Sequence, residues 1–231
     1  MYIITNGMKE DSQSLVILER IMSNLVNYYP HGKSLTIQLF IILGSLNISG
    51  AVLRFGQCLS PPVVENFDIA SFFTGRWYEI QSNGNELFQG VGTCSALVSR
   101  VTEDDRIVLK TYSYKPILEN YVTIDGSSLT QIISNISAVL PIRFDMYGGL
   151  VGKVYQAQII DTDYINFAVV YLCKQGFIFK SEMAYLLSRS RNFVEDQFSA
   201  RIGSAMYTIG LTASDLRRSI NSNCGYNEPA V

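Results

Sequence analysis

Gly75-Arg76-Trp77, Thr162-Asp163-Tyr164 and Leu186-Leu187-Ser188-Arg189 are the three short stretches that decide the fold of this chain. Each of them occurs by chance in many proteins when it is taken alone. Here they follow one another in a fixed order, with β-rich runs around them. We therefore treat them as one pattern.

Short β-rich runs separated by turn residues fill the chain from the first motif to residue 188. Breaks such as Asn83-Gly84, Asp125-Gly126 and Gln175-Gly176 recur between the runs, which is typical of a meandering antiparallel sheet. The Asp125-Gly126 break is either a hairpin or a bulge within one long strand. The predicted strands cover residues 76–82, 93–102, 106–114, 119–124, 128–134, 137–146, 151–160, 164–173 and 177–188.

After Arg191 the periodicity becomes helical. Asn192 is a candidate N-cap, and Glu195 and Asp196 would lie in the favourable first turn. This pattern predicts one amphipathic helix that covers the outside of the sheet. Its stripe comprises Phe193, Val194, Gln197, Phe198, Ile202, Ala205 and Met206.

Composition indicates one globular domain and excludes some partners. The chain has 231 residues, 48% of them hydrophobic, and its 18 basic and 20 acidic side chains leave a net charge of −2. A chain of this length can form a single all-β barrel. No Lys/Arg cluster forms an electrostatic footprint for phosphate backbones, so nucleic acid is not an expected partner.

The N-terminal part has the layout of a secretory leader. Residues 34–46 form an uncharged apolar run between Lys33 and the small residues Ser49 and Ala51, as in a signal peptide. The run is shorter than the roughly 20 residues of a spanning helix, and a buried helix or strand is the alternative. We expect residues 1–51 to be an N-terminal extension with the signal peptide, Met22 being an alternative start, and residues 52–231 to be a single secreted domain.

All four cysteines follow the expected cleavage site, and an even count in a secreted domain indicates two disulfides. The sequence alone permits three pairings. No spacing resembles a close metal-binding pair, so no metal site is expected. Asn135-Ile136-Ser137 fits the glycosylation pattern of a secreted protein.

The sequence gives little support for an enzyme. The only histidine, His31, lies upstream of the apolar leader, so a mature chain would lack the imidazole of a Ser-His-Asp triad, a Cys-His pair or a haem axial ligand. We expect no catalytic residues and no cofactor.

The three motifs resemble the signature of the lipocalins, and the resemblance covers roughly residues 58–224. It implies an all-β fold: an eight-stranded up-and-down antiparallel barrel with one C-terminal α-helix packed outside. The cysteine positions resemble those of the apolipoprotein D and bilin-binding branch. That resemblance implies the pairs Cys58 with Cys173 and Cys94 with Cys224.

The resemblance also gives the motifs structural roles. It implies that Trp77 and Arg189 meet at the closed end of the barrel, with the guanidinium stacked on the indole. The other structural residues that it implies are Gly75, Thr162, Asp163 and Tyr164.

The family alignment fixes which side chains face into the barrel. Only in residues 137–146 does the sequence itself show which face is inward, because Leu140, Ile142 and Phe144 alternate there with polar or proline positions. Core packing and pocket lining are hard to separate by pattern. Glu79 would also face inward, as a buried carboxylate of raised pKa or a structural residue. The expected ligand contacts are Leu87 and Phe88 of a lid loop, Leu109, Leu140, Ile142, Phe144, Tyr155, Ala157, Ile159, Ala168, Val170, Met183, Tyr185 and Leu187.

A barrel of this kind predicts a secreted carrier of one small hydrophobic ligand. The resemblance implies a fatty acid, a sterol, a retinoid or a tetrapyrrole pigment, with no stable membrane insertion. One alternative is an isomerase of the same fold that uses a free thiol. Another is an interaction protein whose barrel is filled by its own side chains.

Overall fold

The computed structural model describes residues 52–83, 92–131, 137–146, 148–224 and 227–230. The chain divides into two compact units, residues 1–48 and 49–231, and the described residues all belong to the second. The expected signal peptide, the lid residues Leu87 and Phe88, and the glycosylation site Asn135 lie outside the described residues.

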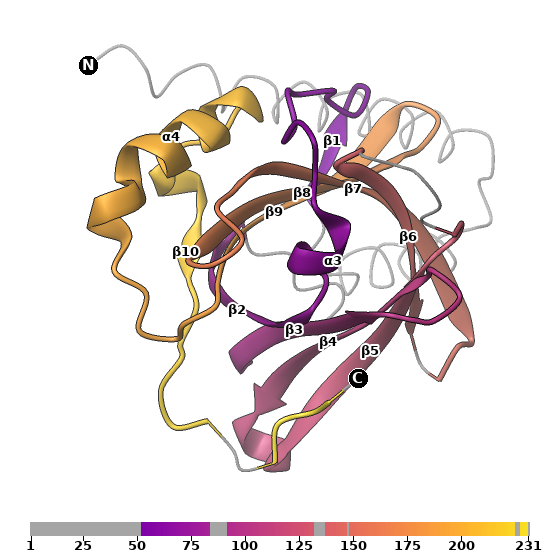
Figure 1. Cartoon of the computed structure of the whole chain (residues 1–231), viewed down its shortest axis with the longest axis vertical. Coiled ribbons are helices and arrows are strands. Elements are labelled where there is room, and N and C mark those ends of the chain that lie inside the picture. Colours follow the sequence, from indigo (N-terminus) through magenta and orange to yellow (C-terminus); the bar gives the residue numbers. More distant parts are fainter. Residues whose placement is uncertain (1–51, 84–91, 132–136, 147, 225–226, 231) are drawn as a thin grey trace, which may run out of the picture. The chain divides into compact units, whose positions relative to one another are not determined.

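Eight antiparallel strands form a closed barrel, which confirms the predicted fold class (Figure 1). Each strand pairs with the next one along the chain, and β9 returns to pair with β2. Closure leaves the barrel strands without a free edge. The strands are β2 (Gly75–Ser82), β3 (Thr93–Val101), β4 (Ile107–Lys115), β5 (Asn120–Ser128), β6 (Val139–Met146), β7 (Val151–Thr162), β8 (Phe167–Gln175) and β9 (Phe179–Ser188).

Smaller elements surround the barrel, and several of them carried no sequence signal. Two short strands, β1 (Val52–Phe55) and β10 (Arg217–Arg218), pair with β9 and β2. In Figure 1 the short helix α3 (Ile69–Phe72) lies within the ring of strands and α4 (Ser199–Thr208) lies beside it. The 3-10 turns are η1 (Pro116–Leu118), η2 (Glu195–Phe198) and η3 (Ala213–Asp215).

The predicted break between the strands 119–124 and 128–134 is wrong, and the alternative of one long strand is right, although without a bulge; residues 132–134 lie outside the described residues. Strand β5 runs through Asp125 and Gly126 and pairs with β4 without a register shift, so the break is neither a hairpin nor a bulge. Glycine is needed there for close packing: a Cβ on Gly126 would lie 2.6 Å from Cδ1 of Leu109 on the neighbouring strand. A glycine inside a strand often marks such an approach.

The C-terminal helix exists but begins later than predicted. Val194 has an extended backbone, residues 195–198 form the 3-10 turn η2, and the α-helix starts at Ser199. Asn192 is therefore not its N-cap. Ile202, Ala205 and Met206 pack on the outer face of the sheet in a second core that includes Val169, Tyr171 and Leu186. Val194 and Gln197 of the predicted stripe are exposed.

Arg189 locks the closed end of the barrel. Its guanidinium lies 3.8 Å from the centre of the Trp77 ring. It also donates hydrogen bonds to the carbonyl oxygens of Ser71, Phe72 and Arg76, at 2.9, 3.1 and 3.1 Å. Burial lowers the pKa of Arg189 to about 10, so the side chain stays charged at neutral pH.

The Arg189→Lys variant should lose about 2 kcal/mol of unfolding free energy. A lysine keeps the positive charge over the indole, but its compact ammonium has three donors, whereas the planar guanidinium reaches four carbonyls, that of Tyr164 included. Urea denaturation would measure the loss. Arg218→Lys is the matched control, because Arg218 is exposed and its ion-pair partner among the described residues is Glu195, near the surface. Equal loss in both variants would contradict this account of the lock.

Thr162, Asp163 and Tyr164 build the turn between β7 and β8. Asp163 Oδ1 accepts hydrogen bonds from the backbone N–H groups of Ile165, Asn166 and Phe167. Burial opposes ionisation of the carboxyl, but a hydrogen bond from the Asn166 side chain and these backbone bonds outweigh it and lower its pKa. Tyr164 has a left-handed backbone at φ 65°, and its hydroxyl accepts from the N–H of Asp68. The motif therefore joins this turn to the segment that enters α3.

Two disulfides tie the chain to the barrel with the expected pairing. Cys58 pairs with Cys173 of β8, and Cys94 of β3 pairs with Cys224. The second bridge holds a C-terminal segment in the wall of the barrel. There the N–H of Ser219 donates to Ile80 of β2, and the carbonyl of Ile220 accepts from Cys94. Because β2 and β3 pair only between Gly75 and Tyr78, this segment fills the gap where they separate.

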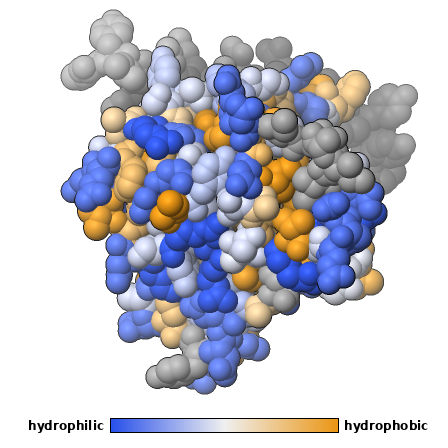
Figure 2. Space-filling model, viewed as in Figure 1, coloured by the Kyte–Doolittle hydropathy of each residue, from blue (hydrophilic) through white to orange (hydrophobic). Residues whose placement is uncertain are grey.

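The coloured residues on the face seen in Figure 2 are mixed, with hydrophobic residues in separate small groups among hydrophilic ones. Among the residues that the structure describes, no helix is long and apolar enough to cross a membrane.

Candidate ligand-binding site

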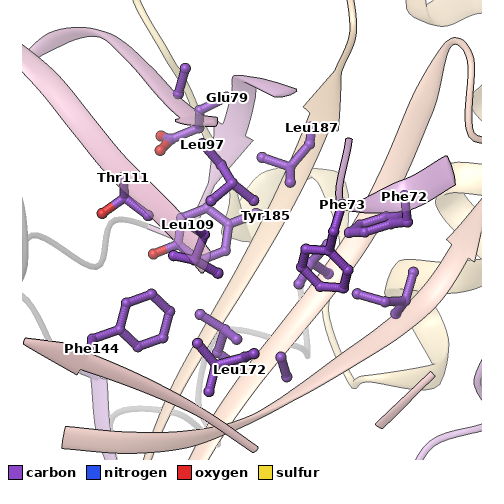
Figure 3. A pocket seen from close by; sticks show the side chains of 15 residues that line it. Phe72, Phe73, Glu79, Leu97, Leu109, Thr111, Phe144, Leu172, Tyr185 and Leu187 are labelled. Atoms are coloured by element: carbon purple, nitrogen blue, oxygen red, sulfur yellow. The ribbon is translucent and has the colours of Figure 1, made fainter. Parts of the chain in front are cut away.

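A cavity of about 90 Å³ lies among the inward-facing side chains of the barrel (Figure 3). Successive side chains of a strand point to opposite faces, so alternate residues of most strands reach it; seven strands contribute, and only on β3 do two adjacent residues, Ala96 and Leu97, line it. Phe72 and Phe73, at the end of α3, contribute as well. The lining residues are Phe72, Phe73, Glu79, Ala96, Leu97, Leu109, Thr111, Ile142, Phe144, Ala157, Ile159, Val170, Leu172, Tyr185 and Leu187.

The structure brings most of the expected contact residues together. Eight of them line the cavity: Leu109, Ile142, Phe144, Ala157, Ile159, Val170, Tyr185 and Leu187. Four others are buried in the same inner core without lining it: Leu140, Tyr155, Ala168 and Met183. The ring of Tyr155, for example, packs edge-on against Phe144 at 6.1 Å. These four positions stabilise the wall around the cavity.

Sequence reasoning missed several lining residues. Leu172 and Thr111 have the same strand parity as Val170 and Leu109, so the alternation could have found them. Phe72 and Phe73 precede the first motif, in a helix too short to show a periodicity. The remaining missed residues are Ala96 and Leu97 of β3.

The polar atoms of the cavity gather on one side. Figure 3 shows the oxygens of Glu79, Thr111 and Tyr185 on one side of the pocket and the rings of Phe72 and Phe73 on the other. The Tyr185 hydroxyl donates to the sulfur of Met183 at 3.5 Å. Burial, and next the nearby Glu79, raise the pKa of Tyr185, so this phenol stays neutral and can donate a hydrogen bond. The site thus combines an apolar cup with a small polar corner.

Glu79 is the acidic member of this corner. Its Oε1 accepts a hydrogen bond of 2.5 Å from the hydroxyl of Ser219 in the C-terminal segment. Burial raises the pKa of the Glu79 carboxyl, while hydrogen bonds from Ser219 and Ser82 oppose that rise. The carboxylate would therefore gain from any further group that stabilises its charge.

Stability should depend on pH through Glu79. Because its folded pKa lies above the ordinary 4.5, the unfolded chain releases this proton first as pH rises, and the folded state loses stability relative to it. Glu79→Gln does not titrate. We expect its unfolding free energy to exceed that of the wild type increasingly above pH 4.5, until the folded carboxyl is ionised. Urea denaturation across this range measures the difference. If the unfolding free energy of the wild type rose relative to that of the variant with increasing pH, the burial argument would be contradicted.

The described lining residues suit neither haem nor a metal ion. Iron in haem is held by His, Cys, Met or Tyr side chains, and among these types the described lining has the buried phenol of Tyr185 alone. No group of three or more His, Cys, Asp or Glu suited to a metal ion occurs in the described ranges. The arrangement suits a small organic ligand.

Comparison with known proteins identifies the family. A family model described as Nitrophorin matches residues 58–231. Apolipoprotein D of Macaca fascicularis is 30% identical over 156 residues, which are 62% of this chain and 71% of that protein.

Two solved structures show the same fold. Insecticyanin of Manduca sexta has a TM-score of 0.59 at 19% identity, over 77% of this chain and 94% of its own. The amine binding protein of Rhodnius prolixus, solved as its tryptamine complex, has a TM-score of 0.54 at 20% identity, over 71% of this chain and 86% of its own. With the closed barrel, the Arg189–Trp77 lock and the family match together, the chain belongs to the Nitrophorin family of lipocalins, in the branch of apolipoprotein D and the bilin-binding proteins.

Proposed function

We propose that the protein is a secreted carrier that holds one small, largely hydrophobic molecule in the barrel cavity. The observation that carries the proposal is the cavity itself, in which twelve of the fifteen lining residues are apolar. Moving apolar surface from water into such a cup is favourable by about 25 cal/mol per Å². The three polar side chains would orient the ligand.

The size of the cavity limits the ligand. Its volume of about 90 Å³ is well below the 300 to 1,000 Å³ or so of pockets for drug-sized molecules. Among the expected classes, a sterol or a tetrapyrrole pigment would require the walls to move. A compact molecule with one ring, or a slim chain, fits the space better.

Secretion is part of the same proposal. The leader layout of residues 34–46 supports it, and so do the two disulfides, because such bonds persist in oxidising compartments. Residues 52–231 would then be the mature domain, with a sugar at Asn135.

The thiol isomerase and the filled barrel fit less well. The sequence has four cysteines, and all four belong to the two disulfides, so no thiol is left to attack a substrate. An interaction protein with a filled barrel would not keep a cavity beside Glu79 and Tyr185. We therefore propose a carrier that performs no chemistry on its ligand.

Extraction of the native protein tests this function. The full chain should be secreted from eukaryotic cells, purified without detergent, extracted with organic solvent and analysed by mass spectrometry. We expect a small apolar compound in near-stoichiometric amount. The Ala157→Phe variant, which places a ring in the cavity, should lose it. If the wild type carried no compound and bound no apolar fluorescent probe, the carrier proposal would be wrong.

A further inference from the structure

The position of Glu79 is unusual for a carboxylate. It follows Trp77 by two residues on β2, so both side chains face into the barrel, and it lies opposite Leu187 of β9. Protein surrounds it, yet part of its side chain remains open and lines the cavity. A ligand in the cavity would therefore meet this carboxylate directly.

The hydrogen bonds of Glu79 leave room for a ligand. An ionised carboxylate accepts about four hydrogen bonds, and the neutral hydroxyls of Ser219 and Ser82 supply two. In the described part of the chain no lysine or arginine forms an ion pair with it; the ion pairs there use other carboxylates, such as Glu182, Glu195 and Glu228. Among the residues that the structure describes, Glu79 is therefore a buried acid without a counter-ion.

A buried charge without a partner is costly, and a partner of opposite charge in good hydrogen-bonding geometry offsets much of that cost. A ligand with an ammonium group would supply both the charge and the donors. An ionised fatty acid would instead bring a second negative charge next to Glu79. The carboxylate therefore favours a positively charged ligand over a negatively charged one.

The rest of the cavity defines the body of such a ligand. Phe72, Phe73 and Phe144 and several aliphatic side chains form its walls. Aromatic rings pack well against one another in offset or edge-on arrangements. The small volume favours a ligand with a single ring and a short side chain over a larger one. Tyr185 adds a neutral hydroxyl next to the carboxylate.

We propose that Glu79 determines the specificity of the cavity and binds the protonated amine of a small aromatic amine. This inference rests on the proposed carrier function and names the chemical class of its ligand. Ser219 is the positioning residue: the bridge between Cys94 and Cys224 holds its segment in the barrel wall, and its hydroxyl fixes one oxygen of Glu79.

Three matched compounds test the proposal by calorimetric titration of the full chain: 2-phenylethylamine, 2-phenylethanol and 3-phenylpropanoate. They share a phenyl ring and differ in the charge of the head group. We expect the wild type to bind the amine at least about tenfold more tightly than the alcohol, since hydrogen bonds to charged groups exceed neutral ones by such a factor. The carboxylate should bind most weakly.

Glu79→Gln keeps the shape of the side chain and removes the charge. In this variant the preference for the amine should vanish, while binding of the alcohol remains. Thr111→Val is the control: it alters another polar lining residue and should keep the preference. Ser219→Ala should reduce the preference and leave binding of the alcohol unchanged. A near-ultraviolet circular dichroism signal of Trp77 like that of the wild type would show that each variant is folded.

The pH dependence gives an independent readout. Because burial raises the pKa of Glu79, the amine should bind more tightly as rising pH ionises the free carboxyl. The titratable group beside it in the cavity is the phenol of Tyr185, and Tyr155 lies next to Tyr185 in turn; burial raises the pKa of each phenol, so neither ionises at neutral pH. A protonated Glu79 that donates to a neutral ligand would give the opposite slope, which would overturn the proposal.

Failure of this inference differs from failure of the carrier function. If the alcohol and an apolar probe bind but Glu79→Gln leaves the preference for the amine unchanged, Glu79 does not determine specificity, and the carrier proposal stands. If the wild type binds none of the three compounds and no apolar probe, both proposals fall.

Discussion

Replacing Cys58 and Cys173 together by alanine should lower the free energy of unfolding by about 2 to 5 kcal/mol. The bridge joins residues 115 positions apart and anchors the segment before α3 to β8. Without it, the unfolded chain gains the entropy that loop closure removed, and a loop of this length gives a value near the upper end of that range. Urea denaturation followed by Trp77 fluorescence measures the change.

The second bridge provides the comparison. The Cys94→Ala, Cys224→Ala variant should lose stability of the same order, because its loop spans 130 positions. It should also lose part of the preference for amines, since the segment with Ser219 is no longer held in the wall. An unchanged denaturation midpoint in either variant would refute the role assigned to that bridge.

Tyr185→Asp should abolish binding of an apolar fluorescent probe. Tyr185 lines the cavity beside Glu79, and a second carboxyl there either lies unpaired in an apolar site or takes up a proton and water. Either outcome costs several kcal/mol of binding free energy. Fluorescence titration of the folded variant gives the affinity.

Arg143→Asp is the control for this prediction. Arg143 lies on β6 between the lining residues Ile142 and Phe144, but its side chain is about half exposed and pairs with Asp145. A charge reversal at this outward position should leave probe binding nearly unchanged. If Arg143→Asp lost the probe and Tyr185→Asp kept full affinity, the inside and outside of the barrel would be assigned the wrong way round.

The turn residues between short β-rich runs predicted a meandering sheet because such signals act locally, and the resemblance to the lipocalins supplied its closure into a barrel. Where the prediction failed, the cause was a contact between strands. In sequence, Gly126 looks like a turn residue. In the structure a glycine is needed there because Leu109 of the neighbouring strand β4 occupies the space that a side chain would take. The short elements α3 and β10 are set by tertiary contacts and show no period.

The candidate site was predicted only in part, because contacts in three dimensions also decide which residues line it. Parity places Tyr155 and Tyr185 inside the barrel alike, and only packing in three dimensions makes Tyr185 a lining residue and Tyr155 a wall residue. The pairing of Glu79 with Ser219 spans 140 positions and depends on a segment inserted between two strands. No local pattern of residues reports such a contact.

The central claim is that a small ligand binds inside the barrel. Isotope-filtered nuclear Overhauser spectroscopy on methyl-labelled protein saturated with unlabelled 2-phenylethylamine tests it most directly. We predict contacts from the ligand protons to the methyl groups of Leu109, Ile142 and Val170, which line the cavity. Contacts confined to Ile202 of α4 and to Leu211, which pack against the outer face of the barrel, would contradict it.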